Sequence, residues 1–560
     1  MGGATPSPIT STQRTCKTRS LVPISNLLQP ADFETLKALA TQACSQIPVN
    51  TAPKYLEEVE TTGLSNGMTQ LQMSAEDAAL TKQKHAGALI PLDAVVKVFC
   101  VHTEPNFSVP WQMKRPYNSK SSGFIISGRR LLTNAHSVHF QTQIRVQGRC
   151  SSKKFLARAL AINRDCDLAL LTVDDDEFWE TMTSLVEIGD LPDLQEAVTL
   201  VGYPVGGNTM SVTRGVVSRI VYTSYSGASY FLAVQIDAAI NCGNSGGPAF
   251  DDKGQCVGIA FQKLTTDCDN IGYLIPTSVI AHFIRDYELN GDCTEFPALG
   301  ITWQTLENPD LRNALCMAAH LEGICVLEIE PTSPAAKFLQ PSDIILSFDG
   351  VNIANDGTVP FLNGERINFG YLVTAKYMGE QAKFQIFRDS VIRNFDIELQ
   401  TYKPLIPKYI KGRAPSYYII GGIVFISVSV PYLCSEFDDD FCHAAPPSLI
   451  NKYLHSVAHT EDEELVIVSQ ILDDEINIDY EDCTNCQVVS FNGKSIRNLV
   501  QLTQLVETCR EPFLRFGIEE HHQMLVLDSR KAKEATPRIM KTHCIPSAIS
   551  EDLLPSLTGL

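Results

Sequence analysis

Between residues 92 and 287 the chain alternates short apolar runs with turn-forming residues, and this pattern restricts the folds open to it. Many short strands separated by turn signals are typical of a sandwich or a barrel. A segment of roughly 195 residues is long enough for two packed six-stranded β-barrels. Strands are predicted at 94–101, 122–126, 130–133, 143–146, 167–173, 197–202, 213–222, 231–236 and 256–261, and a helix at 279–287 is predicted to close the unit.

Two later segments share a different pattern. Residues 296–401 read as strand, turn, short helix and strand, followed by a tight Asp-Gly turn. A second segment repeats this, since VVSFNG at 488–493 parallels ILSFDG at 345–350. We therefore predict a mostly β chain whose parts are a flexible N-terminal region (1–91), the double barrel (92–290), two α+β domains (295–402 and 415–530) and a surface extension (531–560).

Composition argues against several classes of function. The chain has 560 residues, 44% hydrophobic and 19% charged, and its formal net charge is −19. That field repels a phosphate backbone, so nucleic-acid binding by the body of the protein is disfavoured. The 17 cysteines are odd in number and irregularly spaced, which favours free thiols in a reducing compartment. Cys483 and Cys486 form one close pair, but Cys509 and His521 are only loose candidates for further zinc ligands, so no metal or other cofactor is predicted.

The N-terminal region and one uncharged stretch raise questions of targeting. The first 31 residues contain no Asp or Glu and carry Arg14, Lys17 and Arg19 among many Ser and Thr, which suits an organelle transit peptide. A plain disordered tail has the same composition, and both interpretations stay open. Residues 414–435 are uncharged, but from Ile423 onward their apolar residues alternate, so buried strands are predicted there rather than a transmembrane helix.

The strongest motif is GNSGGP at 243–248. A serine hydroxyl is a poor nucleophile until a base takes its proton, and it needs amide donors aimed at the developing oxyanion. Glycines on both sides of Ser245 let the backbone turn tightly, so the N–H groups of Gly243 and Ser245, joined by that of Asn244, are predicted to converge on one point. By itself such a motif is also compatible with an ordinary glycine-rich turn, so it needs partners.

Two other motifs supply those partners. His136 ends TNAH at 133–136, directly after an apolar run, where a rigid strand can hold an imidazole. Asp167 opens the apolar run in DCDLALL at 165–171, so its carboxylate is predicted to lie at the edge of a core and to accept a hydrogen bond from His136. Asp165 is the rival, but only Asp167 directly precedes the apolar residues. Together the motifs predict a Ser-His-Asp triad of His136, Asp167 and Ser245.

TNAH, DCDLALL and DAAINCGNSGGPAF, in this order, resemble the HtrA (Deg, or Do-like) serine proteases. The plant Deg group with two PDZ-type domains is similar over further segments at 101–111, 201–207, 355–361 and 543–548. The resemblance implies a chymotrypsin-like double six-stranded β-barrel followed by two α+β PDZ-like domains. It also implies ATP-independent endoproteolysis of unfolded or damaged proteins, sometimes chaperone-like behaviour, and homo-trimers or hexamers. By motif position, His136, Asp167 and Ser245 carry over as the triad and Gly243 as an oxyanion donor.

Two positions near Ser245 bear on the oxyanion turn and on substrate specificity. Residue 242 is Cys, where the family usually has Pro or a small residue. It softens the oxyanion turn, offers a redox handle, or is simply a tolerated small apolar residue. Ala239 stands six residues before Ser245, where a trypsin-like enzyme would have Asp. Cleavage after small or medium aliphatic residues is therefore predicted, with an apolar pocket wall formed by Ile236, Ala239, Ile240, Ile259 and Phe261.

The two PDZ-type segments carry different binding signals. ALGI at 298–301 resembles a carboxylate-binding loop, so Leu299, Gly300 and Ile301 are predicted to take a peptide C-terminus as an added strand. A plain strand entry is the competing interpretation. GIVF at 422–425 lacks the central glycine, so we expect the second domain to be degenerate and structural.

Functions from other classes remain as alternatives. A catalytically idle, chaperone-like PDZ scaffold would not need the three catalytic motifs, which argue against it. A non-proteolytic serine esterase fits the predicted domain order less well. The compartment stays undecided, because the best-matching stretches resemble the nuclear subgroup of the plant proteases while the N-terminal composition favours a chloroplast or a mitochondrion.

Overall fold

The computed structural model describes residues 90–557, apart from residues 150, 206, 208, 226–228, 264–270, 411, 439 and 520–522. The predictions for residues 1–89 lie outside the described residues. Within the described part, no helix has the length and apolar content needed to cross a membrane.

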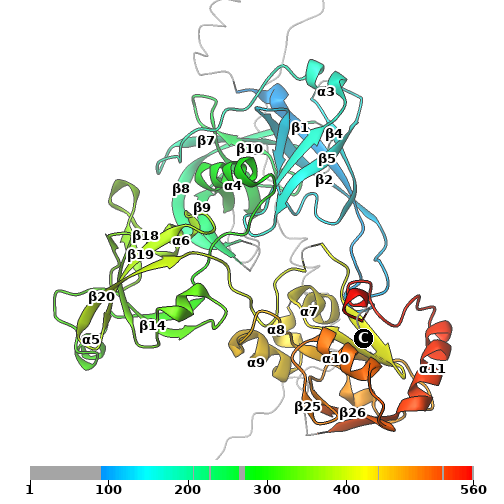
Figure 1. The fold of residues 1–560 in the computed structure, drawn as a ribbon. Helices are drawn as coiled ribbons and strands as arrows, with labels where there is room; N and C mark the ends of the chain where they lie inside the picture. The colour runs from blue at the N-terminus through cyan, green and yellow to red at the C-terminus, as the bar shows by residue number, and fades with distance from the viewer. Residues whose placement is uncertain are drawn as a thin grey trace, which may run out of the picture. The chain divides into compact units, whose positions relative to one another are not determined.

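The first barrel is a closed sheet in the order β1-β2-β3-β6-β5-β4, drawn in blue to cyan in Figure 1. Every residue of β6 is buried, because this strand is covered on both faces. The short helix α3 (Asp176–Thr181) adds Phe178 to the core, and the Asp175 carboxylate caps it by accepting from the Glu177 amide. The strands are β1 (Val95–His102), β2 (Tyr117–Ile126), β3 (Arg130–Thr133), β4 (Gln141–Gln147), β5 (Phe155–Asn163) and β6 (Leu168–Val173).

The second barrel closes in the order β10-β11-β12-β9-β8-β7. Helix α4 (Thr277–Asn290) follows it and ends at Gly291, whose φ of 73° provides the left-handed C-cap. Both closed barrels confirm the fold predicted from the short apolar runs. The strands are β7 (Ala197–Gly202), β8 (Ser211–Tyr225), β9 (Ser229–Ile236), β10 (Pro248–Phe250), β11 (Cys256–Lys263) and β12 (Gly272–Pro276).

The next domain is built on a sheet in the order β13-β14-β15-β19-β20, with β16 paired to β15. Strand β13 lies at the edge of this sheet, and the short helix α6 (Gly370–Thr374) belongs to the same domain. The remaining elements are β13 (Ile301–Thr305), α5 (Pro309–Ala314), β14 (Ile324–Ile329), β15 (Ile344–Phe348), β16 (Val351–Asn352), β17 (Thr358–Pro360), β18 (Arg366–Asn368), β19 (Gln381–Arg388) and β20 (Val391–Glu398).

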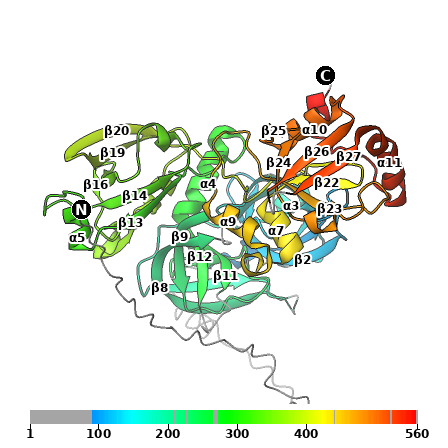
Figure 2. The same ribbon diagram turned by 90° about the horizontal axis from the view of Figure 1, so that it is seen from below.

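The last domain combines a sheet in the order β21-β22-β23 with a sheet in the order β25-β24-β26-β27 (Figure 2). Strand β22 ends at Ser427, earlier than the alternating pattern predicts. Pro431 stands in the first turn of α7, where a missing N–H costs nothing. The elements are β21 (Tyr417–Ile420), β22 (Ile423–Ser427), α7 (Val430–Phe437), α8 (Phe441–Ala444), α9 (Pro447–His455), β23 (Val466–Ile471), β24 (Val488–Phe491), β25 (Lys494–Ser495), α10 (Leu499–Glu507), β26 (Phe513–Ile518), β27 (Met524–Asp528) and α11 (Ser529–Thr542).

The C-terminal residues, expected as a surface extension, belong to this last domain. Helix α11 buries Ala532, Ala535 and Ile539, which helical spacing places on one face. Beyond it, Ile549 forms an antiparallel bridge with Tyr418 of β21. Ile545 and Leu553 are buried as well, so these few apolar residues anchor the segment to the domain.

Candidate active site

His136 and Asp167 are brought together by the pairing of β3 with β6. These strands are antiparallel neighbours, with Thr133 opposite Ala169. The residues that follow β3 therefore meet the residues that precede β6. The Ala135 amide and the Asn134 side-chain amide both donate to the Asp167 carbonyl, at 3.1 and 3.0 Å. These two bonds fix the backbone around residues 134, 135 and 167 without help from the side chains of His136 and Asp167.

The Asp167 carboxylate holds His136 at two points. One oxygen accepts from the His136 backbone N–H at 2.9 Å, and the other lies 2.7 Å from Nδ1 of the imidazole. The Asp167 side chain is 5% exposed, while the imidazole is 47% exposed. A proton on Nδ1 satisfies this contact and leaves Nε2 as the free acceptor, which is the tautomer a general base needs.

Two opposing effects set the pKa of His136. Burial by itself lowers the pKa, because it disfavours the charged imidazolium. The negative charge of Asp167 and its hydrogen bond raise the pKa, and the net shift is upward. Asp165, the rival carboxylate, faces a different partner and accepts from the Ser229 hydroxyl at 2.7 Å. Asp167 is therefore the carboxylate that the structure pairs with the histidine.

Ser245 lies in the turn before β10, and this turn is held against the first barrel by Ser122 of β2. The Ser122 amide donates to the Ser245 carbonyl at 2.9 Å, and its hydroxyl donates to the Gly243 carbonyl at 2.8 Å. The Ser122 carbonyl in turn accepts from the Thr133 hydroxyl at 2.8 Å, at the end of the strand that leads to His136. Ser122 thus connects the serine turn with the histidine strand, and no motif in the sequence marked it.

Gly246 shows how closely these two segments approach each other. Its φ is +81°, and a Cβ at this position would lie 2.1 Å from the Ser122 carbonyl oxygen and 2.4 Å from the Thr133 hydroxyl. Only glycine fits there. In the described part of the chain, no hydrogen bond joins the Ser245 hydroxyl to the imidazole. Such bonds often tighten only when a substrate is bound.

The three amides predicted to form the oxyanion hole are not equivalent. The N–H groups of Gly243 and Ser245 have no acceptor among the described residues, so both are available to a ligand. The Asn244 N–H is occupied, because it donates to the Asn241 carbonyl at 2.9 Å. The Cys242 carbonyl accepts from the Val205 amide at 2.7 Å. Since the N–H and C=O of a trans peptide point in opposite directions, this bond turns the Gly243 N–H away from Val205.

The residues predicted to line the specificity pocket lie in different hydrophobic clusters or at the surface. Ile240 is buried in the apolar cluster of the second barrel, while Ile259 and Phe261 belong to a different cluster. Ala239 is exposed, and its carbonyl accepts from the Thr213 hydroxyl at 3.3 Å.

In the first PDZ-type domain, residues 298–301 lead into the edge strand β13. The N–H groups of Leu299 and Gly300 have no acceptor among the described residues. The carbonyls point into the domain, since Leu299 O accepts from the Ser333 hydroxyl at 2.6 Å and Gly300 O from the Glu330 amide at 2.7 Å. A cavity of about 540 Å³ adjoins this loop, and its lining includes Leu299, Gly300 and Ile301 together with residues of α6.

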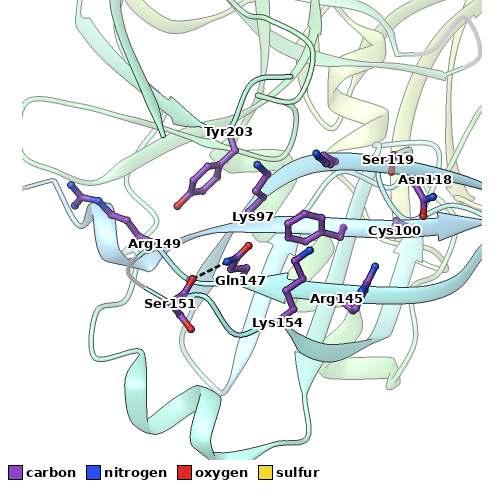
Figure 3. A pocket seen from close by; sticks show the side chains of 13 residues that line it. Lys97, Cys100, Asn118, Ser119, Arg145, Gln147, Arg149, Ser151, Lys154 and Tyr203 are labelled. Carbon is purple, nitrogen blue, oxygen red and sulfur yellow. Dashed lines mark hydrogen bonds between the residues drawn. The ribbon is translucent and has the colours of Figure 1, made fainter. Parts of the chain in front are cut away.

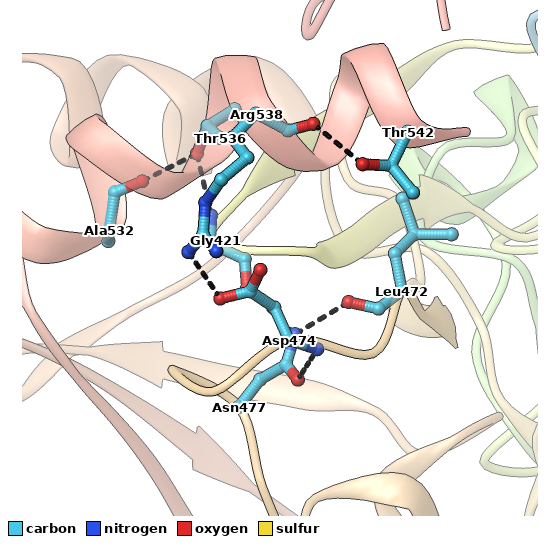
Figure 4. A network of polar contacts seen from close by, with 8 residues as sticks. All are labelled: Gly421, Leu472, Asp474, Asn477, Ala532, Thr536, Arg538 and Thr542. Carbon is cyan, nitrogen blue, oxygen red and sulfur yellow. Dashed lines mark hydrogen bonds and ion pairs between the residues drawn. The ribbon is translucent and has the colours of Figure 1, made fainter. Parts of the chain in front are cut away.

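The corresponding turn of the second PDZ-type domain, at Gly421, hydrogen-bonds to other residues of the same domain (Figure 4). The Gly421 N–H donates to the Thr536 hydroxyl of α11 at 2.8 Å. The Gly421 carbonyl accepts from the Asn477 side chain at 2.9 Å, and the Gly422 carbonyl accepts from the Leu472 amide at 2.8 Å. The same Asn477 amide also donates to the Leu472 carbonyl at 2.8 Å. The Gly421 N–H, which an open loop would offer to a peptide, is therefore already paired, while the Gly422 N–H has no acceptor among the described residues.

Family models match the chain in three places. A trypsin-like peptidase domain matches residues 121–259, and PDZ domains match residues 297–399 and 406–552. With the double barrel and the paired histidine and aspartate, this defines a serine-type endopeptidase that carries two PDZ domains.

Named relatives identify the family. The chain is 46% identical over 465 residues to "Protease Do-like 2, chloroplastic" of Arabidopsis thaliana, covering 83% of this chain and 76% of the relative. It is 43% identical over 464 residues to "Protease Do-like 4, mitochondrial" of the same plant, covering 82% and 85%. The chain belongs to the Do-like (Deg) serine proteases, which confirms the resemblance seen in its motifs. Among solved structures, "HtrA-type protease AlgW with decapeptide" is similar at 24% identity and a TM-score of 0.44, covering 56% of this chain and 96% of that one.

Proposed function

We propose that this protein is an ATP-independent endopeptidase that cleaves unfolded or damaged proteins through an acyl-enzyme on Ser245. The observation that carries the proposal is one arrangement: the His136–Asp167 pair is connected through Thr133 and Ser122 to a serine turn with two unoccupied amides. A nucleophile, a base and an oxyanion site are the parts that acyl transfer requires.

In this mechanism the Ser245 hydroxyl attacks the carbonyl carbon of the scissile peptide bond, and His136 Nε2 takes the hydroxyl proton. The amides of Gly243 and Ser245 hold the oxyanion. His136 then protonates the leaving amine, which departs and leaves an ester on Ser245. A water molecule, activated by the same imidazole, hydrolyses the ester. Asp167 stays charged and stabilises the imidazolium throughout.

Casein degradation without nucleotide tests this proposal. Wild-type protein is expected to cleave casein and to react covalently with a fluorophosphonate probe. Ser245→Ala should lose at least about 10³-fold in rate and all labelling. Ser456→Ala, which changes an exposed serine outside the site, should behave as wild type. Equal casein cleavage by wild type and Ser245→Ala would instead favour the idle scaffold.

The first PDZ domain would recruit substrates by their C-termini. Two unoccupied amides at Leu299 and Gly300, an edge strand and an adjoining cavity suit a peptide that adds as a strand. A peptide with a free C-terminus should therefore bind at least about tenfold more tightly than its amidated form. Equal affinities in fluorescence polarisation would contradict this role. The second PDZ domain, whose turn is internally paired, would serve a structural role.

For cleavage specificity and oligomeric state, we propose what the family resemblance and the residue at position 239 imply. Cleavage after small or medium aliphatic residues is supported by the alanine at position 239, and peptide profiling that showed strict cleavage after Lys or Arg would exclude it. We expect a homo-trimer or hexamer, which light scattering of the full chain would measure. A monomer at working concentration would contradict that expectation.

An organelle is the compartment we propose. The relatives named above are described as chloroplastic and mitochondrial, and the N-terminal composition suits a transit peptide. The nuclear alternative finds no support among these relatives. A fluorescent fusion of the full chain would distinguish the compartments, and accumulation in the nucleus would contradict the proposal.

A further inference from the structure

A basic pocket lies on the outer surface of the first barrel, apart from the catalytic groups. It has a volume of about 620 Å³, and the second barrel contributes Tyr203 to its wall (Figure 3). Its lining contains five cationic side chains and no Asp or Glu. The complete lining is Lys97, Phe99, Cys100, Asn118, Ser119, Lys120, Arg145, Gln147, Gly148, Arg149, Ser151, Lys154 and Tyr203. For a chain with a net charge of −19, such a concentration of positive charge in one hollow needs an explanation.

The strand register explains how the cations come together. Phe99 of β1 stands opposite Lys120 of β2 on one side and opposite Arg145 of β4 on the other. Directly opposed residues share a face of the sheet, so this row places two cations about one aromatic ring. The ammonium of Lys154 lies 4.0 Å from the centre of the same ring. Figure 3 shows Lys97, Arg145 and Lys154 extending from adjacent segments of this barrel.

Three of these cations have no carboxylate partner in the described part of the chain: Lys120, Arg145 and Lys154. Nε of Arg145 is moreover buried without any hydrogen-bond partner. The contrast with Lys153 is informative, since that residue turns away and pairs with Glu177 at 2.5 Å. Like charges gathered on one sheet face are destabilising, and so is a buried donor without an acceptor. A bound anion would relieve both penalties.

The same excess of positive charge affects the pKa of Lys97. Its ammonium is buried and donates to the Gly207 carbonyl at 3.1 Å. Burial lowers the pKa of Lys97, and the nearby charges of Lys120 and Lys154 lower it further. An anion in the pocket would oppose that repulsion.

The fold restricts what kind of anion can bind. Strands β1, β2 and β4 lie inside a closed barrel, and both edges of β1 are paired. An acidic peptide therefore cannot add its backbone to β1, the strand at the centre of the pocket. Recognition at this strand comes from side chains, and a cluster of ammonium and guanidinium groups matches a compact anion with several charges. We propose that this pocket binds a small oligophosphate, whether an inorganic oligophosphate, a nucleoside triphosphate or an inositol polyphosphate.

Calorimetric titration of the full chain at about 0.15 M salt tests the proposal, with inorganic tripolyphosphate, ATP and inositol hexakisphosphate as separate probes. At least one should bind saturably, and comparison of the three identifies the source. The double variant Lys120→Glu/Lys154→Glu should weaken binding at least about tenfold, and the milder Lys120→Gln/Lys154→Gln should weaken it less. Both lysines are exposed, so the fold should persist. Lys531→Glu/Lys533→Glu makes the same charge change at two exposed positions of α11 and should leave the affinity unchanged.

Three results would overturn the proposal. The first is no saturable binding of any of the three phosphates. The second is equal binding by wild type and by both double variants. The third is a poly-glutamate peptide that binds as tightly as the best phosphate, which would replace the proposed ligand class with an acidic segment of protein.

Discussion

The hydroxyl of Ser122 donates to the carbonyl of Gly243 at 2.8 Å, so a strand of the first barrel holds the oxyanion turn of the second. The same hydroxyl accepts from the Tyr203 amide at 2.8 Å. These bonds connect segments 121 and 81 residues apart in sequence. The position of the oxyanion turn at 243–245 therefore depends on how the two barrels pack against each other.

Removing this hydroxyl should therefore impair catalysis more than folding. Ser122→Ala leaves two polar groups without their partner, so we expect about 1–3 kcal/mol of lost stability and a fall in kcat of about tenfold or more. The neighbouring Ser121 is the matched control, because its hydroxyl is buried without a partner. Ser121→Ala should keep wild-type kcat. Steady-state hydrolysis of casein and urea unfolding would measure both, and equal kcat for the two variants would contradict the role of Ser122.

Gly246→Ala tests the close approach between the serine turn and the histidine strand. A Cβ would meet the Ser122 carbonyl oxygen at 2.1 Å, so we expect a loss of more than about 3 kcal/mol in stability or complete inactivation. Gly291 provides a control with a similar backbone conformation, at φ +73°, and open space around it. Gly291→Ala should cost only about 1 kcal/mol. Thermal unfolding that ranked the two variants equally would argue against the packing.

The pH dependence of catalysis should follow His136. Its neutral form acts as the base, and Asp167 raises its pKa, so kcat/KM should fall as the pH drops through this raised pKa. In Asp167→Asn only the lowering effect of burial remains, so the acid limb should move to lower pH while the rate falls by up to about 10⁴-fold. Asp165→Asn should leave the limb in place. An unmoved limb in Asp167→Asn would contradict the assignment.

The contact between His136 and Asp167 also affects folding stability, and its pH dependence is opposite to that of catalysis: low pH favours stability and reduces activity. Because the pKa of His136 is raised in the folded protein, its interaction with Asp167 stabilises the fold below the unfolded pKa of about 6.5. This contribution disappears as the pH rises through the folded pKa. Urea unfolding of wild type and Asp167→Asn at several pH values should show a difference that is largest in acid. A difference that grew with pH would contradict this.

Thr536→Val tests whether the turn of the second PDZ domain is structural. The Thr536 hydroxyl accepts from the Gly421 amide and donates to the Ala532 carbonyl, so its loss leaves a buried N–H unpaired. We expect a destabilisation of about 1–3 kcal/mol. Thr542→Val, at an exposed position of the same helix, should change stability by less than about 0.5 kcal/mol. Chemical unfolding with equal midpoints for both variants would contradict the role of Thr536.

The sequence indicated the strands well where apolar residues alternate or cluster. Strands β3 and β7 run over the predicted residues, and β1 is shifted by one. The short strand β10 was not predicted, because three residues carry too little periodicity. The C-terminal residues were interpreted as an extension because their few apolar side chains become a buried face only when helix α11 meets β21 and β27.

The identities of His136, Asp167 and Ser245 could be read from the sequence, because each stands in a short motif next to an apolar run or a glycine turn. The choice of Asp167 over Asp165 also followed from the local pattern. Local sequence cannot show which backbone amides are already occupied. That Asn244 is paired while Gly243 and Ser245 are not depends on the neighbours the turn meets in the folded domain.

By itself, then, the sequence determined the double barrel and the three side chains of the proposed triad, because periodicity and glycine turns are local properties, and its resemblance to the Do-like proteases implied the PDZ pair. Tertiary structure alone decided the role of Ser122, the orientation of the Cys242–Gly243 peptide and the basic pocket around Phe99. The physical reason is that these features arise from hydrogen bonds and charges on segments far apart in the chain, and only folding sets the distances between them.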